Sequence, residues 1–357
     1  MKILFTIGNL ESGGAEKVTA TLANNFRDQK HDVAILMVSE ARSASFYSLK
    51  DGVELIPLLS LEKKYSIKEK VTKISQFIES FNPDVVISFL NYVVVYTYFA
   101  LKHCLNRNKI CFVVSERNNP KKVPGSFAYR MLRNHIFNKA DGCVFQTNDA
   151  KSYFKKVKKS EIIPNPVYLT NKSKRDSANE DIVLVGSDKK EKNRAMAFKA
   201  FSLYKKENPL SKLIIIGQKS NKKEMRLIKK LKIEESVDFV GKQKDWHEDY
   251  KNSKMFLLTS NYEGMPNALL EACALQIPCI STDCPSGGPN AILENGKRGI
   301  LVPVKNYKIF AKQMINLSKD NELCEYYSTI NKNLSDMYDE KAISKKWVDF
   351  IATIKKM

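Results

Sequence analysis

FLLTSNYEGMPNALLEACA, residues 256–274, is the stretch that decides the fold. It opens with an apolar run of strand length and continues through a polar turn at 260–264. Pro266 predicts the start of a helix, because its missing N–H and fixed φ suit the first helical position. A strand, a loop and a helix in this order turn backbone N–H groups near 265–267 and the positive end of the helix dipole toward the loop. The stretch therefore predicts an anion site.

Two carboxylates frame the predicted anion site. Glu263 lies in the loop ahead of the helix, and Glu271 lies within the helix, about 7 Å further along its axis. Gly264 lacks a Cβ and lets the backbone approach a ligand closely. The alternative is an ordinary strand–loop–helix with two surface acids, because a pair of glutamates alone does not define a site.

The string EGMPNALLE, residues 263–271, resembles the Glu-x7-Glu signature of the retaining glycosyltransferases of family 4, which have the two-domain GT-B fold. The resemblance implies that Glu271 accepts hydrogen bonds from the ribose hydroxyls of a nucleotide sugar. It also implies that Glu263 contacts the donor hexose near its 3-hydroxyl and that configuration is retained. Since the sequence offers no clear carboxylate nucleophile, we expect a same-face mechanism rather than a covalent intermediate.

Length and charge narrow the class of protein. At 357 residues the chain is long enough for two domains, each with a full core. Its 59 basic and 39 acidic residues give a net charge of +20, which indicates a polyanion, an anionic bilayer or a phosphate-rich substrate as partner. Seven scattered cysteines without a CxxC motif predict reduced, buried thiols.

No segment of the sequence indicates export or insertion into a membrane. The N-terminal KILFTIG is too short for the core of a signal peptide, and the apolar segment 90–101 is shorter than a membrane span. We therefore expect a cytoplasmic protein.

Strand-like and helix-like segments alternate in both halves of the chain, which predicts right-handed crossovers and two parallel, doubly wound sheets. We expect an α/β protein of the GT-B type with an N-terminal, acceptor-binding domain at 1–167 and a C-terminal, nucleotide-sugar-binding domain at 168–338. A helix in 339–357, with Trp347, Phe350, Ile351 and Ile354 as its apolar stripe, is expected to cross back onto the first domain. The first boundary is placed in the polar segment 169–181, after a hinge strand at 162–167. The other predicted strands are 3–7, 32–38, 53–58, 84–89, 110–115, 142–147, 181–186, 212–217, 237–241, 255–260, 278–283 and 299–304.

The first predicted strand runs into GNLESGGAEKV, residues 8–18. Gly13 and Gly14 come just before a helix, so their amides can face an anion at its N-terminus. The spacing does not fit GxGxxG, which argues against a dinucleotide site, and a tight turn is the alternative. In family 4 this glycine loop faces the donor diphosphate and the acceptor.

The second domain opens with VLVGSDKKEKNRA, residues 183–195. Lys192 stands just before a helix start, a position from which an ammonium can reach a phosphate. A solvated basic loop is the alternative. Members of family 4 usually carry an arginine where Ser187 stands here. Either Lys189 or Lys190 takes over the role of that arginine, or the diphosphate is bound more weakly.

Arg117 follows a strand of the first domain, in the string SERNNP. Many members of family 4 have a histidine at this place, which reaches toward the donor sugar. The alternative for Arg117 is a structural salt bridge with Glu116 or another nearby acid. A subset of bacterial capsule and lipid-linked-glycan transferases shares four strings with this sequence, which are SERN, FQTxxAKxYF at 145–154, PNPV at 164–167 and DCPSGGP at 283–289.

The chemistry that these parts support is sugar transfer without a metal. No DxD string is present to hold Mg²⁺, and a lysine and a helix N-terminus can stabilise the charge that builds on the β-phosphate of the leaving nucleotide. We predict a retaining α-glycosyltransferase that moves a hexose or N-acetylhexosamine from a nucleotide sugar, expected to be a UDP sugar, to a polyprenyl-diphosphate-linked glycan in bacterial surface polysaccharide or glycan assembly. No cofactor is expected. The predicted catalytic residues are Glu263, Arg117 and Lys192, and the predicted donor-binding residues are Gly13, Gly14, Lys189, Lys190, Gly241, Gly264, Met265, Pro266, Asn267 and Glu271.

Two rival functions are weighed against this prediction. Another GT-B enzyme, such as a nucleotide-sugar 2-epimerase, needs no glycan acceptor, and the EGMPNALLE string argues against it. A nucleic-acid binder would explain the positive charge, but the lysines are spread widely and no helix-turn-helix, RRM or KH signature occurs. We therefore expect no nucleic-acid partner.

The segment 63–81 indicates attachment of the enzyme to a membrane surface. Ile67, Val71, Ile74, Ile78 and Phe81 recur at steps of three and four, which is one apolar helical stripe. Lysines crowd the first half of this segment, and a second lysine cluster lies at 151–159. We predict a peripheral enzyme on the cytoplasmic face of the membrane, with both clusters toward anionic headgroups. The alternative is a stripe packed on the sheet with solvated lysines outside. The lysines of the first cluster are Lys63, Lys64, Lys68, Lys70 and Lys73.

Overall fold

A computed structural model describes residues 1–40, 45–167, 169 and 179–355. The chain divides into two compact units. Unit 1 is Met1–Pro166 with Asp339–Met357, and unit 2 is Val167–Tyr338. These divisions fall within one residue of the expected boundaries. The polar segment 169–181, on which the first boundary rested, lies largely outside the described residues.

Unit 1 contains a seven-stranded sheet in the order β3-β2-β1-β4-β5-β6-β7, with every pair of neighbours parallel. The strands are β1 (Lys2–Ile7), β2 (Asp32–Glu40), β3 (Val53–Leu59), β4 (Val85–Phe89), β5 (Cys111–Ser115), β6 (Gly142–Phe145) and β7 (Ser160–Ile162). The strand predictions for this half are confirmed except at 162–167, where β7 ends at the first residue of the predicted run. Pro164 and Pro166 follow, and proline has no N–H to donate to a strand ladder.

Helices cover both faces of this sheet. One core cluster joins α1 and α14 to strand residues such as Ile3, Phe5 and Ile87, and the other joins α2 to α5 to residues such as Leu4, Val86 and Phe112. Alternate residues of one strand therefore serve opposite cores, as expected for a doubly wound sheet. The helices are α1 (Gly14–Asp28), α2 (Ile67–Phe81), α3 (Asn91–His103), α4 (Phe127–Lys139), α5 (Asn148–Tyr153) and α14 (Glu340–Lys355), with a short 3₁₀ turn at Arg107–Lys109.

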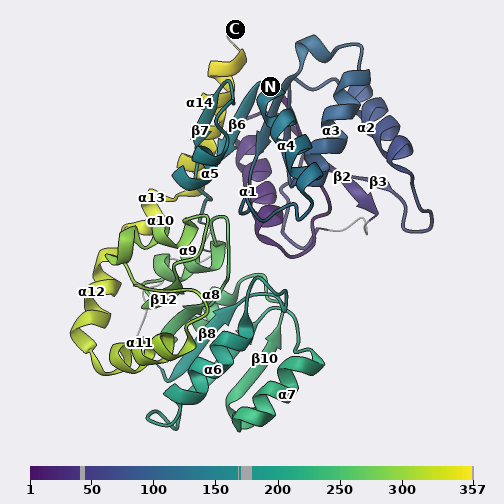
Figure 1. The fold of residues 1–357 in the computed structure, drawn as a ribbon. Coiled ribbons are helices and arrows are strands. Elements are labelled where there is room, and N and C mark those ends of the chain that lie inside the picture. The colour runs from purple at the N-terminus through teal and green to yellow at the C-terminus, as the bar shows by residue number, and fades with distance from the viewer. Residues whose placement is uncertain (41–44, 168, 170–178, 356–357) are drawn as a thin grey trace. The chain divides into compact units, whose positions relative to one another are not determined.

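The last helix, α14, belongs to the core of unit 1 although it ends the chain. In Figure 1 it appears as a yellow helix among the purple and teal elements of that unit. Trp347 is fully buried, and its ring lies 5.8 Å from that of Phe89 on β4. A Cβ on Gly142 of β6 would lie 2.2 Å from Ile354 Cδ1, so a larger residue there would have to displace the end of this side chain. The predicted apolar stripe of this helix is therefore a packing surface.

Helix α2 starts later than the sequence predicts, at Ile67, because Ser66 caps it. The Ser66 hydroxyl accepts from the Glu69 backbone, and the Glu69 carboxylate accepts from the Ser66 backbone, which is a complete capping box. Val71, Ile74 and Ile78 are buried in the core, whereas Ile67 is 66% exposed. The apolar stripe packs on the sheet, as the structural alternative states, and the lysines of this segment lie outside the core, where an anionic surface can reach them.

Unit 2 contains a six-stranded sheet in the order β10-β9-β8-β11-β12-β13, again with all neighbours parallel. All six strands were predicted. They are β8 (Asp181–Val185), β9 (Lys212–Ile216), β10 (Val237–Gly241), β11 (Met255–Leu258), β12 (Cys279–Thr282) and β13 (Ile300–Val302). The helices are α6 (Arg194–Tyr204), α7 (Lys222–Leu231), α8 (Trp246–Tyr250), α9 (Asn267–Ala274), α10 (Gly288–Ile292), α11 (Tyr307–Lys319), α12 (Asn321–Asn331) and α13 (Leu334–Met337), with 3₁₀ turns at Glu234–Ser236 and Glu294–Gly296.

The strand order reverses once in each sheet. In unit 2 the chain proceeds from β8 outward to β10, then returns to place β11 on the other side of β8. In unit 1 the same reversal separates β1 from β4. Loops that leave the two central strands diverge at such a switch point and leave a crevice for ligands at the carboxyl ends of the strands. The predicted doubly wound α/β fold is confirmed in both units. Among the described residues, no helix combines the length and apolarity needed to cross a bilayer.

We predict that Trp347→Ala destabilises unit 1 by about 3–5 kcal/mol, because it removes a large, fully buried ring and leaves a cavity. Urea unfolding followed by far-UV circular dichroism measures the loss. Lys346→Ala is the matched control, since Lys346 is the exposed neighbour on the same helix and should change stability by less than about 0.5 kcal/mol. Equal stability of the two variants would contradict the packing role of α14.

Candidate active site

Lys192 and Glu263 meet at the switch point of unit 2. Lys192 lies in the loop after β8, and Glu263 lies in the loop after β11, the two strands between which the sheet order reverses. The Lys192 Nζ is 2.6 Å from Glu263 Oε1, and the Ser260 hydroxyl donates to the same oxygen at 2.6 Å. The side chains are 26% and 12% exposed, so the pair is partly shielded from water yet reachable.

Asn261 ties these two loops together. Its backbone N–H donates to the Glu191 carbonyl at 2.7 Å, and its side-chain amide donates to the Lys190 carbonyl at 3.1 Å. The Asn193 side chain donates in turn to Asn261 Oδ1 at 3.2 Å. Backbone and side-chain bonds together fix the position of the Lys192 loop against the Glu263 loop.

The DCPSGGP string supports Glu263 from the other side. The Glu263 N–H donates to the Pro285 carbonyl at 2.9 Å, and the Ser286 N–H donates to the Glu263 carbonyl at 3.0 Å. A Cβ on Gly288 would lie 1.7 Å from the Gly264 carbonyl oxygen, so α10 can approach this loop only with glycine there. Burial raises the pKa of Cys284 to about 12, which keeps this thiol protonated. The 283–289 segment therefore holds the backbone of Glu263 in place.

Glu271 lies on α9 and is only 5% exposed. Its Oε2 accepts from the Trp246 indole N–H at 2.9 Å and lies 3.2 Å from His247 Nε2. The alternative of two surface acids is thus wrong for Glu271. Helix α9 begins at Asn267, one residue later than predicted, because Pro266 has an extended ψ of 107° and serves as the N-cap. Of the other predicted donor-binding residues on this loop, Gly264 and Met265 are buried and Asn267 is half-buried.

The basic loop after β8 contains two exposed lysines. Lys189 and Lys190 form no ion pair with any residue that the structure describes. Ser187, at the position of the usual arginine, is half-buried. Arg194 does not replace that arginine, because it is 2% exposed and its guanidinium is held by Glu224 at 2.8 and 2.5 Å. The exposed lysines remain the candidate substitutes.

Gly241 ends β10 at the carboxyl edge of the same sheet. Its φ of +81° lies in the region that glycine tolerates best. Its carbonyl accepts from the Gly217 N–H at 2.8 Å. Gly241 thus lies at the edge that carries the Lys192 and Glu263 loops, on the outermost strand.

In unit 1, Gly13 and Gly14 begin α1, after β1 and beside the switch point. The Gly13 N–H donates to the Tyr47 hydroxyl at 3.1 Å, and that hydroxyl donates to the Gly13 carbonyl at 2.9 Å. A Cβ on Gly13 would lie 2.1 Å from Glu16 Oε2. The Gly13 amide is therefore engaged by Tyr47 in this structure, and the carboxylate of Glu16 lies where the sequence suggested an anion.

Arg117 lies after β5 and packs within unit 1. Its Cζ is 4.3 Å from the Phe89 ring centre and 5.4 Å from that of Trp347, a cation–π arrangement on two sides. Its Nη1 donates to Asn165 Oδ1 at 2.7 Å, and Gln146 donates to the same oxygen at 2.5 Å. Burial lowers the pKa of Arg117 to about 9, so the guanidinium stays charged at neutral pH. Three of the shared strings, SERN, FQT and PNPV, therefore meet at Asn165.

The predicted alternative for Arg117 is wrong, because Glu116 pairs with a different arginine. Arg133 Nη1 lies 3.0 Å from Glu116 Oε2, and both side chains are almost fully buried. Glu116 Oε1 also accepts from the backbone N–H groups of Arg117 and Asn118, each at 3.1 Å. Burial raises the pKa of Glu116, whereas Arg133 and these two amides oppose the rise. The Glu116–Arg133 pair is a structural clamp for the loop that carries Arg117.

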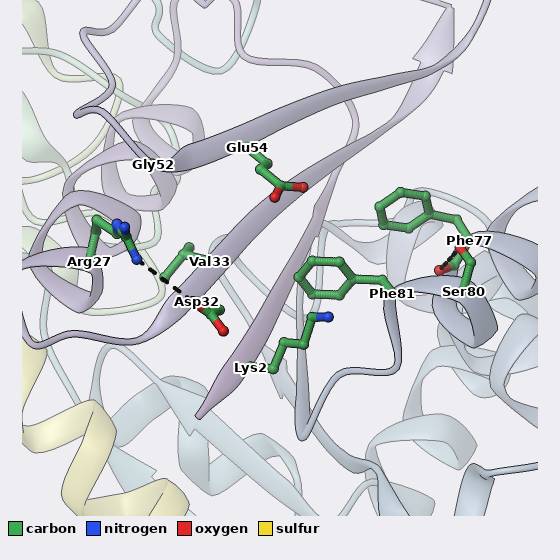
Figure 2. Close-up of a pocket in the computed structure, with 9 residues that line it drawn as sticks. All are labelled: Lys2, Arg27, Asp32, Val33, Gly52, Glu54, Phe77, Ser80 and Phe81. Atoms are coloured by element: carbon green, nitrogen blue, oxygen red, sulfur yellow. Dashed lines mark hydrogen bonds and ion pairs between the residues drawn. The ribbon is translucent and has the colours of Figure 1, made fainter.

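A pocket of 530 Å³ lies at the opposite edge of the unit 1 sheet, by the amino ends of β1, β2 and β3. Figure 2 shows Arg27 and Asp32 on one side and the rings of Phe77 and Phe81 on the other. Lys2 lies with its Nζ 4.5 Å from the centre of the Phe81 ring. None of the predicted site residues lines this pocket.

Several residues of the site were not predicted from the sequence. Ser260 and Asn261 lie inside the quoted stretch, and their polar side chains beside a short strand were the available signal. Asn165 lies in the shared PNPV string. Trp246 and His247 had no such signal, because they are far from Glu271 in sequence and show no periodic pattern.

Comparisons with known proteins identify two matching families. The family described as "Glycosyltransferase Family 4" matches residues 12–171, and the family described as "Glycosyl transferases group 1" matches residues 169–334. Between them the two matches span both units, including the loops that carry Gly13, Arg117, Lys192 and Glu263.

One curated relative and two solved structures illustrate the similarity. The α-1,4-N-acetyl-D-galactosaminyltransferase of Campylobacter jejuni that is named for GalNAc-α-(1→4)-GalNAc-α-(1→3)-diNAcBac-PP-undecaprenol is 28% identical over 371 residues, covering 99% of each chain. TarM superposes with a TM-score of 0.80 at 12% identity, over 98% of each chain. HepE of Anabaena, solved with UDP and glucose, has a TM-score of 0.80 at 16% identity, over 99% of this chain and 100% of its own. Both structures share the fold of this chain.

Proposed function

Because this chain belongs to the glycosyltransferases, with a family 4 domain followed by a group 1 domain, we propose that it is a retaining α-glycosyltransferase of lipid-linked glycan assembly. It moves a hexose or N-acetylhexosamine from a nucleotide sugar to a glycan carried on a polyprenyl diphosphate. The reaction class follows from the family.

The contact between Lys192 and Glu263 at the switch point carries the proposal. When the bond from the anomeric carbon to the nucleotide breaks, negative charge builds on the β-phosphate oxygen. An ammonium and the N-terminus of α9 stabilise this charge as it forms. Glu263 holds the lysine in place through a 2.6 Å contact. We also assign to Glu263 a hydrogen bond from a hydroxyl of the transferred sugar. Lys189 and Lys190 add positive charge in the same loop.

UDP is the nucleotide we assign to the donor. Glu271 supplies the carboxylate that accepts from the ribose hydroxyls, and Gly241 lies on the outer strand of the same edge. HepE, which shares the fold over the whole chain, was solved with UDP and glucose. The ribose contact suits any ribonucleotide, so the assignment of uridine rests on the UDP that HepE binds.

A polyprenyl-diphosphate-linked glycan is the acceptor we assign. The Campylobacter relative is named for an undecaprenol-diphosphate-linked glycan and matches this chain over its full length. The net charge of +20 suits a diphosphate carrier in an anionic bilayer. The reaction then takes place at the cytoplasmic face of the membrane, with the enzyme bound peripherally.

The surface of unit 1 offers a place for this attachment. Helix α2, which carries Lys68 and Lys73, and helix α5, which carries Lys151, lie on the same face of the sheet, and α4 packs between α3 and α5 on that face. Lys159 of the second cluster instead donates to the Thr353 carbonyl on α14. Phe127 and Met131, one turn apart on α4, are 70% and 55% exposed. Exposed apolar side chains flanked by basic residues are suited to the headgroup region of a bilayer.

Donor binding tests the proposed function directly. We would screen UDP, GDP, ADP and TDP sugars by thermal shift, because a ligand that binds only the folded state raises the melting temperature. Product analysis with the best donor and a polyprenyl-diphosphate acceptor then separates transfer from epimerisation. A glycosylated acceptor supports the proposal, whereas an epimerised nucleotide sugar without transfer supports the rival enzyme.

Glu271→Ala and Glu263→Ala should impair different steps. Loss of Glu271 should weaken UDP binding, and loss of Glu263 should mainly lower kcat, because one acid is assigned to the ribose and the other to the sugar. A lost hydrogen bond to a charged group is worth about 1.5–3 kcal/mol, so each effect should be at least about tenfold. Near-normal kinetics in both variants would refute the site assignment.

Activity should not depend on a divalent metal. Lys192, the neighbouring lysines and the α9 N-terminus take the role of the metal in neutralising the leaving diphosphate. Turnover in excess EDTA should therefore stay within about twofold of its starting value. Complete loss that Mg²⁺ or Mn²⁺ restores would contradict this account of leaving-group stabilisation.

Membrane attachment should be electrostatic and specific to unit 1. Flotation with phosphatidylglycerol-containing liposomes should show binding at low salt that weakens at high salt. Changing Lys64, Lys68 and Lys73 to Glu should reduce this binding, because each basic group near an anionic surface contributes about 1 kcal/mol.

The matched control for flotation changes Lys222, Lys223 and Lys230 to Glu. These lysines are exposed on α7 of unit 2, so the net charge changes equally while the α2 surface stays intact. Binding that ignores salt and the α2 changes would contradict the electrostatic attachment, and an equal loss in both triple variants would contradict its assignment to α2.

A further inference from the structure

Three buried side chains of unit 2 meet at one oxygen atom. Trp246 Nε1 lies 2.9 Å from Glu271 Oε2, and His247 Nε2 lies 3.2 Å from the same oxygen. Trp246, His247 and Glu271 are 3%, 1% and 5% exposed. Two donors at one oxygen of a buried carboxylate favour its charged form and restrict its rotation.

The two donors lie on a helix that follows a strand distant from β11 in the sheet order. Trp246 and His247 begin α8, which follows β10 at the outer edge, whereas Glu271 lies on α9, which follows β11 three places along in the sheet order. The Trp246 ring stacks on Phe256 of β11, with ring centres 5.9 Å apart. This stacking brings α8 to the carboxylate and holds it there.

One ring nitrogen of His247, Nδ1, is buried without a hydrogen bond to any residue that the structure describes. A buried polar atom without a partner destabilises a fold, so a side chain that only filled space here would be better apolar. The Nε2 contact with Glu271 accounts for a histidine at this place.

We propose that Trp246 and His247 are positioning residues that hold the Glu271 carboxylate in the orientation that accepts the ribose hydroxyls of the donor. This inference rests on the proposed function, in which Glu271 is the ribose acceptor. An ionised carboxylate offers about four acceptor sites on its two oxygens, and the Trp246 and His247 contacts use two of them, both at Oε2. An acceptor fixed before binding loses less conformational freedom when the ligand arrives.

The test compares UDP with 2′-deoxy-UDP by isothermal titration calorimetry. The ratio of the two dissociation constants isolates the contribution of the 2′-hydroxyl. Wild-type protein should prefer UDP by about tenfold, as expected for a hydrogen bond to a charged group. Partial unfolding of a variant weakens the binding of both ligands alike and leaves the ratio of their dissociation constants unchanged.

Four substitutions and one double variant separate the positioning role from packing. Trp246→Phe keeps a ring on Phe256 and removes the N–H, and His247→Leu removes the second donor. Their combination should lower the preference for UDP to about threefold or less. His247→Gln keeps a side-chain N–H and should restore the preference to within about twofold of wild type. Tyr250→Phe is the control on the same helix, because its hydroxyl interacts with Gln243, and it should leave the ratio unchanged.

The outcomes distinguish this inference from the proposed function. A wild-type ratio near one would overturn the ribose role of Glu271 and the inference with it. A wild-type preference that persists in the folded double variant would overturn the inference alone. If the leucine variants do not fold, Trp246→Phe decides, since a wild-type ratio in that single variant would also overturn the positioning role.

Discussion

The reversal of strand order between β8 and β11 is the constraint on which the candidate site of unit 2 depends. Because β8 and β11 are neighbours in the sheet, the loops that leave them start side by side at its carboxyl edge. Lys192 and Glu263 are thereby brought to 2.6 Å although 71 positions separate them in the chain. The hydrogen bonds of Asn261 then fix the two loops relative to each other.

The charge arrangement at this point suits the transfer of a sugar from a diphosphate. Glu263 holds the partly shielded Lys192 in one orientation, and an approaching diphosphate would bring two further negative groups to the same ammonium. The backbone hydrogen bonds with Pro285 and Ser286 hold Glu263 in position. Catalysis of this kind depends on groups that are positioned before charge develops.

In unit 1, the side chains of Arg117 and Gln146 both donate hydrogen bonds to Asn165 Oδ1. Arg117 also contacts Phe89 and Trp347, so the position of its guanidinium depends on α14. The last helix of the chain thus completes the environment of a residue that lies 230 positions before Trp347 in sequence, as the difference between their numbers shows. A reader of the sequence alone could name Arg117 but could not foresee the two rings that enclose it.

The sequence by itself determined the alternation of strands and helices, the doubly wound class and the helical stripe of α14, because burial on a sheet face imposes a local periodic pattern. It also supplied the Glu263, Glu271 and Lys192 candidates, since turn chemistry and short strings are local features as well. Tertiary structure alone decided that Glu116 pairs with Arg133, that Tyr47 engages Gly13, and that Trp246 and His247 reach Glu271. These are contacts between segments far apart in the chain, and only the packing of helices on the sheet determines which side chains then lie within hydrogen-bonding distance.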